Sequence, residues 1–464
     1  MSSPFVGIIV PGISLIDEGA DRVMDYLRST IGVTTIFLPA YSHSSVIAGR
    51  LTPNPSEPWR DHGMPEPMEL KGGAFFDPHT EFYRNTFIHD FRAPDPEYRG
   101  VDVMALAADA ARPRGIDVVP YFLDALGHGR RDPTPPGFPH TLEVDALGRL
   151  SDGPCLTNPA YGEWVFSLVE DLMKSYPAAG LLWGMERHGP LGQVIDGGAP
   201  VCFCDHCCRA ARDAGLDPVA ARADFEAAWR YVEAVRVGEL RPTDGYFIGF
   251  LRELLRHPQA LVWEKFWLTR YHGFLRRLYG LVKHIDHRLR FGILVWHNAN
   301  IWPLLRAQWD YAEIREFCDY LLPLVTHNTG GVSVVRHLES LAATAFKDVR
   351  APDLLAGFYR IMGYDEGPWD GLPARGFGPE YTRREIRRVV DGAGGRVPVY
   401  AGVGIDLPTP PGIRKTAPED VEAHIRAAHA AGASGFAFRR SYAEMWTKNL
   451  EAAGRTLRVL GVIE

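Results

Sequence analysis

The chain has 464 residues, of which 46% are hydrophobic and 23% charged, a globular composition that does not suggest disorder. Its formal net charge of −7 is spread along the chain without a basic stripe, so we do not expect nucleic acid as a partner. The segment Met1–Gly12 has neither a basic leader nor an apolar stretch long enough to span lipid, so we expect no membrane association and a cytoplasmic location.

Eight short runs rich in Val, Ile, Leu and Phe alternate along the chain with longer segments of helical spacing. Alternation of this kind is typical of α/β proteins, and nearly continuous apolar runs suit strands that are buried on both faces. Eight is the strand number of a (β/α)₈ TIM barrel, which we therefore predict. An open doubly wound sheet is the alternative, but no glycine-rich nucleotide-binding motif follows any of the runs. The runs are Val6–Val10, Thr34–Leu38, Asp117–Phe122, Gly180–Gly184, Arg290–Trp296, Tyr320–Val325, Pro398–Val403 and Gly435–Phe438.

Helical patterns lie between these runs, and two segments are longer than one crossover helix requires. The clearest helices are Asp17–Thr30, Ala160–Ser175, Pro258–Ile285 and Ala417–Ala431. Residues 42–99 and 202–257 each follow a predicted strand, so we expect both to be insertions on the catalytic face. The predicted organisation is one elaborated barrel domain, residues 1–464, with two site-building insertions.

Acidic residues at strand ends are the first candidates for catalysis, because barrel active sites lie at the C-terminal ends of the strands. A glycosidase needs one carboxyl group kept protonated as an acid and a second one that is ionised. Glu186 follows the fourth run by two residues and is the predicted acid; a structural ion pair with Arg187 or another Arg is the alternative. Asp406 follows the seventh run and is the predicted second carboxylate, with Asp124 and Glu444 as rivals.

Aromatic and polar residues after other strands complete a site suited to sugars. Aromatic faces stack on the C–H surface of a pyranose, and Asn or His side chains bind its hydroxyls, although a single His near a strand end is often structural. Arg439 and Arg440 add positive charge, which indicates either an acidic sugar or a partner for Glu186. The predicted substrate-binding residues are Asp124, Trp183, Arg187, His188, Trp296, His297, Asn298, His327, Asn328, Arg439 and Tyr442.

Four of the six cysteines are crowded between Cys202 and Cys208. Three thiols in Cys202-Phe203-Cys204-Asp205-His206-Cys207 are close enough to bind one ion, and Cys155 is the natural fourth ligand of a closed, structural Zn²⁺ site. Cys208 and His206 are competing ligands, and buried free thiols are the alternative. The spacing fits metal binding and reduced thiols better than a secreted disulfide framework.

A lone Cys155 followed by C-x-C-x-x-C, with the Glu186 strand between them, resembles the glycoside hydrolase family 42 β-galactosidases of clan A. The segment from Cys155 to Pro159 and the Gly180–Trp183 run are also similar to uncharacterised glycosyl hydrolases related to that group. The resemblance implies a zinc near the barrel mouth, an acid/base Glu at the end of the fourth strand and a nucleophile at the end of the seventh. Two positions depart from the family: Met185 precedes the Glu in place of Asn, and Asp406 replaces the nucleophilic Glu.

Three functions remain in competition. The favoured one is a glycoside hydrolase that acts on a carbohydrate substrate through Glu186 and Asp406. The second is a metal-dependent sugar isomerase or epimerase that uses Glu186, His297, His327 and Asp124 as ligands. The third is a non-catalytic carbohydrate-binding barrel. Because the related galactosidases associate, a homo-oligomer is also compatible with the resemblance.

Overall fold

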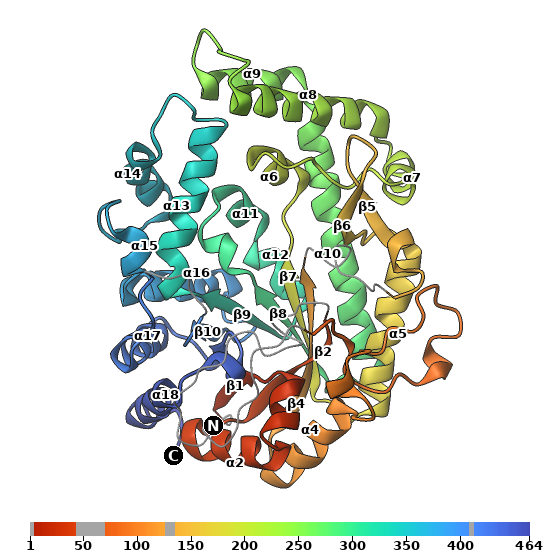
Figure 1. Ribbon diagram of the computed structural model, residues 1–464, viewed down its shortest axis with the longest axis vertical. Coiled ribbons are helices and arrows are strands. Elements are labelled where there is room, and N and C mark those ends of the chain that lie inside the picture. Colours follow the sequence, from red (N-terminus) through yellow and green to blue (C-terminus); the bar gives the residue numbers. More distant parts are fainter. Residues whose placement is uncertain (1–3, 43–69, 126–134, 408–412) are drawn as a thin grey trace.

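The computed structural model describes residues 4–42, 70–125, 135–407 and 413–464. Eight parallel strands pair in chain order, and β11 pairs with β1 through Phe5 and Gly435, which closes the sheet (Figure 1). The predicted TIM barrel is confirmed, and each of the eight apolar runs contains a strand. The strands are β1 (Phe5–Ile9), β2 (Thr35–Ser42), β4 (Asp117–Ala125), β7 (Gly180–Glu186), β8 (Arg290–Val295), β9 (Tyr320–Val325), β10 (Tyr400–Gly404) and β11 (Gly435–Arg439).

Helices surround the barrel, and the last of them, α18, packs against α2. This contact is close, because a Cβ on Gly454 would lie 1.9 Å from the carbonyl oxygen of Thr30. The predicted helix Asp17–Thr30 is divided into α1 (Gly12–Asp17) and α2, since Gly19 between them has a φ of 85°. The surrounding helices are α2 (Ala20–Ile31), α4 (Val103–Ala111), α5 (Pro159–Ser175), α10 (Gln259–Ile285), α12 (Tyr311–Ile314), α16 (Pro379–Ala393), α17 (Pro418–Ala430) and α18 (Thr447–Val459).

Side chains alternate between the barrel interior and the helix layer along each strand. Leu182, Leu294 and Ala437 belong to the apolar cluster that fills the interior. Trp183 and Ile293, the neighbours of Leu182 and Leu294 in their strands, belong instead to the core shared with the helices. This alternation determines which residues at the strand ends face the barrel mouth.

Further elements extend beyond the barrel, mostly in the upper half of Figure 1. The segment between β9 and α16, which contains three helices, was not predicted as an insertion. Helices α7, α8 and the start of α10 share a second apolar core that is separate from the barrel. The additional elements are the hairpin β5 (Leu142–Val144) and β6 (Leu150–Pro154), then α6 (Pro190–Ile195), α7 (Asp205–Asp213), α8 (Pro218–Val237), α9 (Tyr246–Arg256), α11 (Pro303–Gln308), α13 (His327–Ala343), α14 (Ala351–Met362) and α15 (Leu372–Arg375).

Only part of the predicted insertion 42–99 is described. It contains β3 (Gly73–Ala74), which pairs antiparallel with the end of β2.

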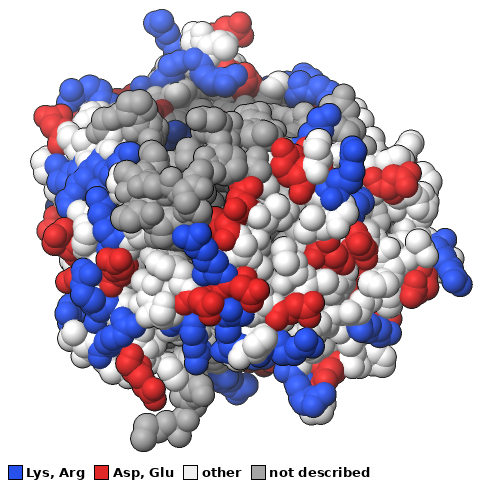
Figure 2. Space-filling view, turned by 60° about the horizontal axis from the view of Figure 1, so that its bottom comes forward, with Lys and Arg blue, Asp and Glu red and all other residues white. Residues whose placement is uncertain are grey.

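On the face shown in Figure 2, side chains of both charges are interspersed. Within the described ranges, no helix combines the length and the apolar character needed to cross a bilayer.

Candidate active site and metal centre

Glu186 is the last residue of β7 and is half-buried at the C-terminal end of the barrel. Since Leu182 lines the barrel interior, the two-residue alternation puts Gly184 and Glu186 on the same, inward side of the strand. The predicted catalytic acid therefore lies at the mouth, where barrel enzymes carry out their chemistry.

Arg439 ends β11, which lies opposite β7 in the closed sheet. It follows Ala437 of the interior by two residues, so it also faces inward, and only 7% of it is exposed. Its Nε and Nη1 atoms are buried and donate no hydrogen bond to any described residue. Burial lowers the pKa of Arg439, and the charges of Tyr121 and Glu186 oppose that shift. A buried guanidinium with unused donors is costly, and a bound ligand would satisfy them.

Tyr121 and His297 share the mouth with these two charges. Burial raises the pKa of the Tyr121 phenol, the charge of Arg439 opposes this effect and that of Glu186 adds to it. Burial, with the charges of Arg439 and Arg440, lowers the pKa of His297 to about 4. His297 is therefore a neutral imidazole near pH 7, able to donate one hydrogen bond and to accept another from a hydroxyl.

An aromatic wall adjoins the mouth. Trp296 follows β8 directly, and the His188 ring stacks on it with a centroid distance of 6.3 Å and an interplanar angle of 15°. Trp302 approaches His188 edge-on at 5.1 Å. Burial lowers the pKa of His188 to about 4, and its Nδ1 has no hydrogen-bond partner. Asn298 lies half-buried in the short helix His297–Asn300 beside this wall.

Trp183, predicted as a substrate contact, does not face the mouth. It is fully buried on the opposite side of β7 from Glu186. Its ring stacks on Phe122 at 4.7 Å and packs against Phe274 of α10 at 5.7 Å. The two-residue alternation of the strand, with Leu182 inside, is the physical reason.

Arg187 and Tyr442, also predicted as substrate contacts, are buried and bond to other parts of the chain. The Nη1 of Arg187 donates to the Pro154 carbonyl at 2.7 Å and lies 3.4 Å from Glu143 Oε1, so this buried side chain holds the β5–β6 hairpin. The hydroxyl of the fully buried Tyr442 donates to Glu18 Oε2 at 3.1 Å. The contacted residues Pro154, Glu143 and Glu18 are all distant in sequence from Arg187 and Tyr442, so no local sequence pattern predicts these contacts.

His327 and Asn328 fix the start of α13. The buried His327 ring stacks on His424 of α17 with centroids 3.8 Å apart, and burial lowers the pKa of His327 to about 3. Asn328 Nδ2 donates to the Leu407 carbonyl at 3.3 Å. These contacts place both side chains in the packing between α13, α17 and the segment that follows β10.

The candidate second carboxylates differ in their partners. The buried Asp406 accepts hydrogen bonds from the Trp446 backbone N–H at 2.9 Å and from Asn449 Nδ2 at 3.0 and 2.9 Å. The buried Glu444 pairs with the Arg440 guanidinium through both carboxylate oxygens. The side chain of Asp124 lies outside the described residues, although its backbone pairs with that of Met185.

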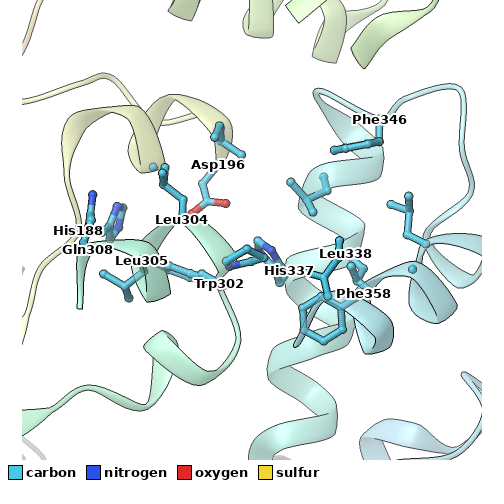
Figure 3. Close-up of a pocket in the computed structure, with 17 residues that line it drawn as sticks. His188, Asp196, Trp302, Leu304, Leu305, Gln308, His337, Leu338, Phe346 and Phe358 are labelled. Atoms are coloured by element: carbon cyan, nitrogen blue, oxygen red, sulfur yellow. The ribbon is translucent and has the colours of Figure 1, made fainter. Parts of the chain in front are cut away.

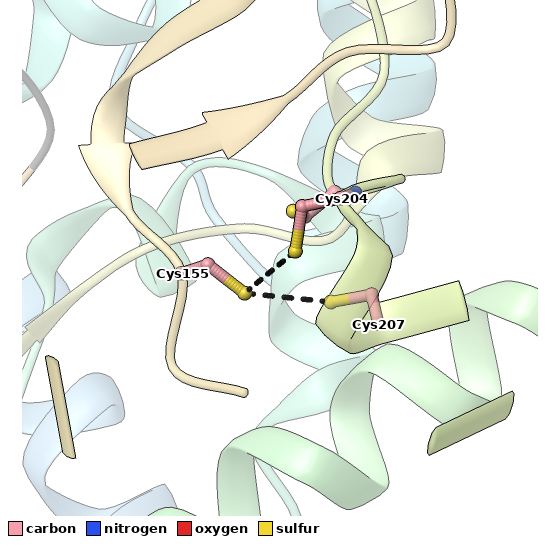
Figure 4. Close-up of side chains that lie close together, drawn as sticks. Cys155, Cys204 and Cys207 are labelled. Atoms are coloured by element: carbon pink, nitrogen blue, oxygen red, sulfur yellow. Dashed lines mark hydrogen bonds between the residues drawn. The ribbon is translucent and has the colours of Figure 1, made fainter. Parts of the chain in front are cut away.

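The predicted cysteine cluster forms around the start of α7 (Figure 4). The Sγ atoms of Cys155, Cys202, Cys204 and Cys207 all lie within 4.8 Å of one another, and all four residues are buried. The Sγ of Cys155 is 3.4 Å from that of Cys207 and 3.5 Å from that of Cys204. A tetrahedral ion with Zn–S bonds of about 2.3 Å separates its sulfurs by about 3.8 Å, so this cage has the right size.

The cluster favours negative charge on one sulfur and disfavours it on two: burial raises the pKa of Cys202, and the hydrogen bond with Cys155 raises that of Cys207. Hydrogen bonds from the three neighbouring thiols lower the pKa of Cys204, which caps the N-terminus of α7. A helix N-terminus attracts anions and thereby favours thiolates. In the described part of the chain, this is the one group of three or more His, Cys, Asp or Glu residues that is arranged to hold a metal ion.

One feature near the mouth was not predicted from the sequence. A cavity of about 410 Å³ lies between α6, α11, α13 and α14, and His188 and Trp302 are part of its wall (Figure 3). The other residues that line this cavity come from helices that are far apart in the sequence. The sequence signal for the cavity was therefore only the close spacing of Trp296 and Trp302.

Comparisons with known proteins support the fold. No family model matches this chain, and no curated protein matches it in sequence. The chain is similar to the PgaB (BpsB) glycoside hydrolase domain from Bordetella bronchiseptica, with 10% identity and a TM-score of 0.51 over 98% of both chains. It is also similar to a β-galactosidase from the haloarchaeon Halorubrum lacusprofundi, with 14% identity and a TM-score of 0.55 over 99% of this chain and 58% of that one.

A third similar structure is the α-L-fucosidase isoenzyme 2 from Paenibacillus thiaminolyticus, with 13% identity and a TM-score of 0.52. It matches 99% of this chain, which spans 49% of that protein's length. This chain thus corresponds to about half of two of these proteins. At such low identities the likeness establishes the barrel fold shared with these glycoside hydrolases.

Proposed function

We propose that this protein is a glycoside hydrolase in which Glu186 is the general acid. The observation that carries the proposal is an inward-facing carboxylate at the C-terminal end of the fourth barrel strand, opposite an inward-facing Arg439. Three proteins of similar fold are named as a glycoside hydrolase domain, a β-galactosidase and a fucosidase. In this role Glu186 protonates the glycosidic oxygen as the bond to the sugar breaks.

Recognition of the sugar follows from the other groups at the mouth. Trp296 offers a ring face to the C–H surface of a sugar, and the neutral His297 exchanges hydrogen bonds with its hydroxyls. Arg439 donates its unused Nε and Nη1 hydrogens to an oxygen of the bound sugar. Asn298 is placed beside these groups to bind a further hydroxyl.

The second carboxylate in this proposal is Asp406. Asp406 lies two residues beyond the end of β10, the seventh barrel strand, whereas Glu444 is paired with the Arg440 guanidinium through both carboxylate oxygens. An ionised carboxylate either attacks the anomeric carbon or removes a proton from the attacking water. Asp124 is the remaining rival.

The cysteine cluster has a structural role in this proposal. Cys155, Cys202, Cys204 and Cys207 would hold a zinc ion, in agreement with the resemblance to family 42. When bound, the ion supplies a cross-link between the β5–β6 hairpin and α7. Because the site is closed by four sulfurs, it leaves no position for substrate. This requires reduced thiols, and all six cysteines are free.

The test is hydrolysis of a panel of aryl glycosides and oligosaccharides by the wild type, Glu186→Gln and Glu451→Gln. Glu451 is exposed on α18 and provides a control with the same chemical change. We expect Glu186→Gln to lower kcat/KM by roughly a hundredfold to ten-thousandfold and Glu451→Gln to leave it unchanged. Full activity in Glu186→Gln would remove Glu186 as the acid. A wild type that cleaves no glycoside would contradict the proposed function.

A further inference from the structure

The cavity beside the mouth has an apolar wall. Leu304 and Leu305 come from α11, Leu338 and Leu341 from α13, and Phe358 from α14. Apolar pockets of 300–1,000 Å³ are typical binding sites for small organic molecules. An apolar cavity of about 150 Å³ already holds benzene, so 410 Å³ has room for a ligand of about two rings.

A few polar groups in this wall lack partners. His337 is 7% exposed, and neither of its ring nitrogens has a hydrogen-bond partner in the described part of the chain. The Oε1 of Gln308 and the Nδ1 of His188 are likewise buried without a partner. A buried polar group without a partner destabilises the protein, so a ligand with one or two polar atoms would gain affinity by bonding to these groups.

Rings connect the mouth to the cavity. Trp296 at the end of β8 lies 5.6 Å from Trp302, and both contact His188. Trp302 in turn lies 6.0 Å from His337, and the two lie side by side in Figure 3. His337 is followed by Phe358 at 6.3 Å. His188 is two residues from Glu186, so the chain that carries the proposed acid also forms the cavity wall.

We infer that this cavity binds the apolar aglycone of the substrate, an aromatic or alicyclic alcohol of about two rings whose polar substituent bonds to His337. The inference rests on the proposed glycosidase function and narrows its substrate class. A sugar would place its hydroxyls against leucines in this cavity, whereas an apolar aglycone buries its surface there and leaves the sugar to Arg439, His297 and Trp296. The preferred substrates are therefore glycosides of apolar alcohols rather than oligosaccharides.

The chain offers a matched pair of variants for the test. Gly357 of α14 lines the cavity, and a Cβ built on it meets no atom within 4 Å, so we expect the side chain of Gly357→Phe to occupy part of the cavity. Gly280 of α10 is equally open and does not line the cavity, which makes Gly280→Phe the control. Both changes replace a glycine inside a helix and should not weaken the helix.

The experiment measures naphthol binding by calorimetry, and hydrolysis of naphthyl and methyl glycosides of one sugar. We expect naphthol affinity and the preference for the naphthyl glycoside each to fall about tenfold or more in Gly357→Phe and to be unchanged in Gly280→Phe.

Equal naphthol binding by both variants, or none by the wild type, would overturn the cavity as a ligand site whether or not glycosides are cleaved. Naphthol binding that Gly357→Phe abolishes without changing the naphthyl preference would overturn the aglycone assignment. If the wild type binds naphthol but cleaves no glycoside, the aglycone assignment and the proposed glycosidase function are both wrong. The cavity would still be a ligand site in that case.

Discussion

Glu186 and Arg439 end strands on opposite sides of the barrel, and both side chains face inward over the interior residues Leu182 and Ala437. The charges of both affect the pKa of Tyr121, which lies in the interior. A carboxylate and a guanidinium are therefore held at one mouth by separate strands, with a buried phenol near both. Holding charged groups at the mouth lowers the stability of the fold, and it keeps those groups available to bind a substrate.

Replacing Arg439 should separate stability from activity. Its buried Nε and Nη1 make no hydrogen bonds within the described part of the chain, so Arg439→Met removes a buried charge without breaking a described hydrogen bond of these two atoms. We expect the melting temperature to stay equal or rise, while kcat/KM on a cleaved glycoside falls by roughly a hundredfold because the sugar loses its donors.

Arg306→Met provides the contrast. Arg306 Nη2 lies 2.9 Å from Glu385 Oε1 and 2.8 Å from the Tyr364 hydroxyl, and Glu385 is buried. Glu385 keeps its contact with Arg388, so losing one of its two guanidinium partners should cost about 2 kcal/mol of unfolding free energy. If Arg439→Met destabilised the protein as much as Arg306→Met, Arg439 would be a structural residue.

The strands were predictable because barrel strands are buried on both faces, which produces the continuous apolar runs that ended at Glu186 and Arg439. The same alternation, applied residue by residue, would also have excluded Trp183, which follows the interior residue Leu182. The Arg187–Glu143 contact was not predictable, since its partner lies on a hairpin with no local signal for the pairing. The cavity was not predictable either, because its wall is assembled from four helices, and one residue of it, His337, has no distinguishing neighbours in sequence.

Asp406 has two possible roles that substitutions can separate. Asp406→Asn removes the charge and keeps one oxygen that can accept the hydrogen bond from the Trp446 N–H. Asn449→Ala removes the other donor and keeps the carboxylate. If Asp406 is the second carboxylate, we expect kcat to fall by roughly a hundredfold or more in Asp406→Asn and by much less in Asn449→Ala. Equal losses of stability with intact kcat in both would identify an anchor for α18, and Asp124→Asn would then be the variant to measure.

The cysteine cluster should bind one zinc ion per chain. We expect Cys155→Ser to lose the metal and to lower the melting temperature, because the hairpin and α7 lose their cross-link. Cys208→Ser is the control, since its Sγ lies near the Phe203 carbonyl, outside the cluster. Elemental analysis and thermal unfolding check both variants. If the protein is purified without zinc and Cys155→Ser is as stable as the wild type, the cluster is a group of four buried thiols and not a metal site.

Glu264 should make stability depend on pH. It is a residue of α10 that accepts hydrogen bonds from the Leu191 N–H at 2.8 Å and from Gln308 Nε2 at 2.5 Å, and burial raises its pKa from 4.5 to about 7. Because the folded-state pKa exceeds the unfolded one, the folded state binds more protons between these values. The contribution of Glu264 to stability is therefore full below about pH 4.5 and is lost as pH rises through about 7, a change of up to about 3 kcal/mol.

Glu264→Gln removes this titration and keeps an acceptor for Leu191. The unpartnered Oε1 of Gln308 can accept from the new amide if the Gln308 side chain turns over, so the contact is retained. We expect Glu264→Gln to gain unfolding free energy relative to the wild type as pH rises from 5 to 8, as measured by urea denaturation at several pH values. Glu451→Gln, on the exposed face of α18, should follow the wild type at each pH. If the unfolding free energies of Glu264→Gln and the wild type change in parallel with pH, Glu264 is ionised throughout this range. The loop that carries His188 would then pack against a charged carboxylate.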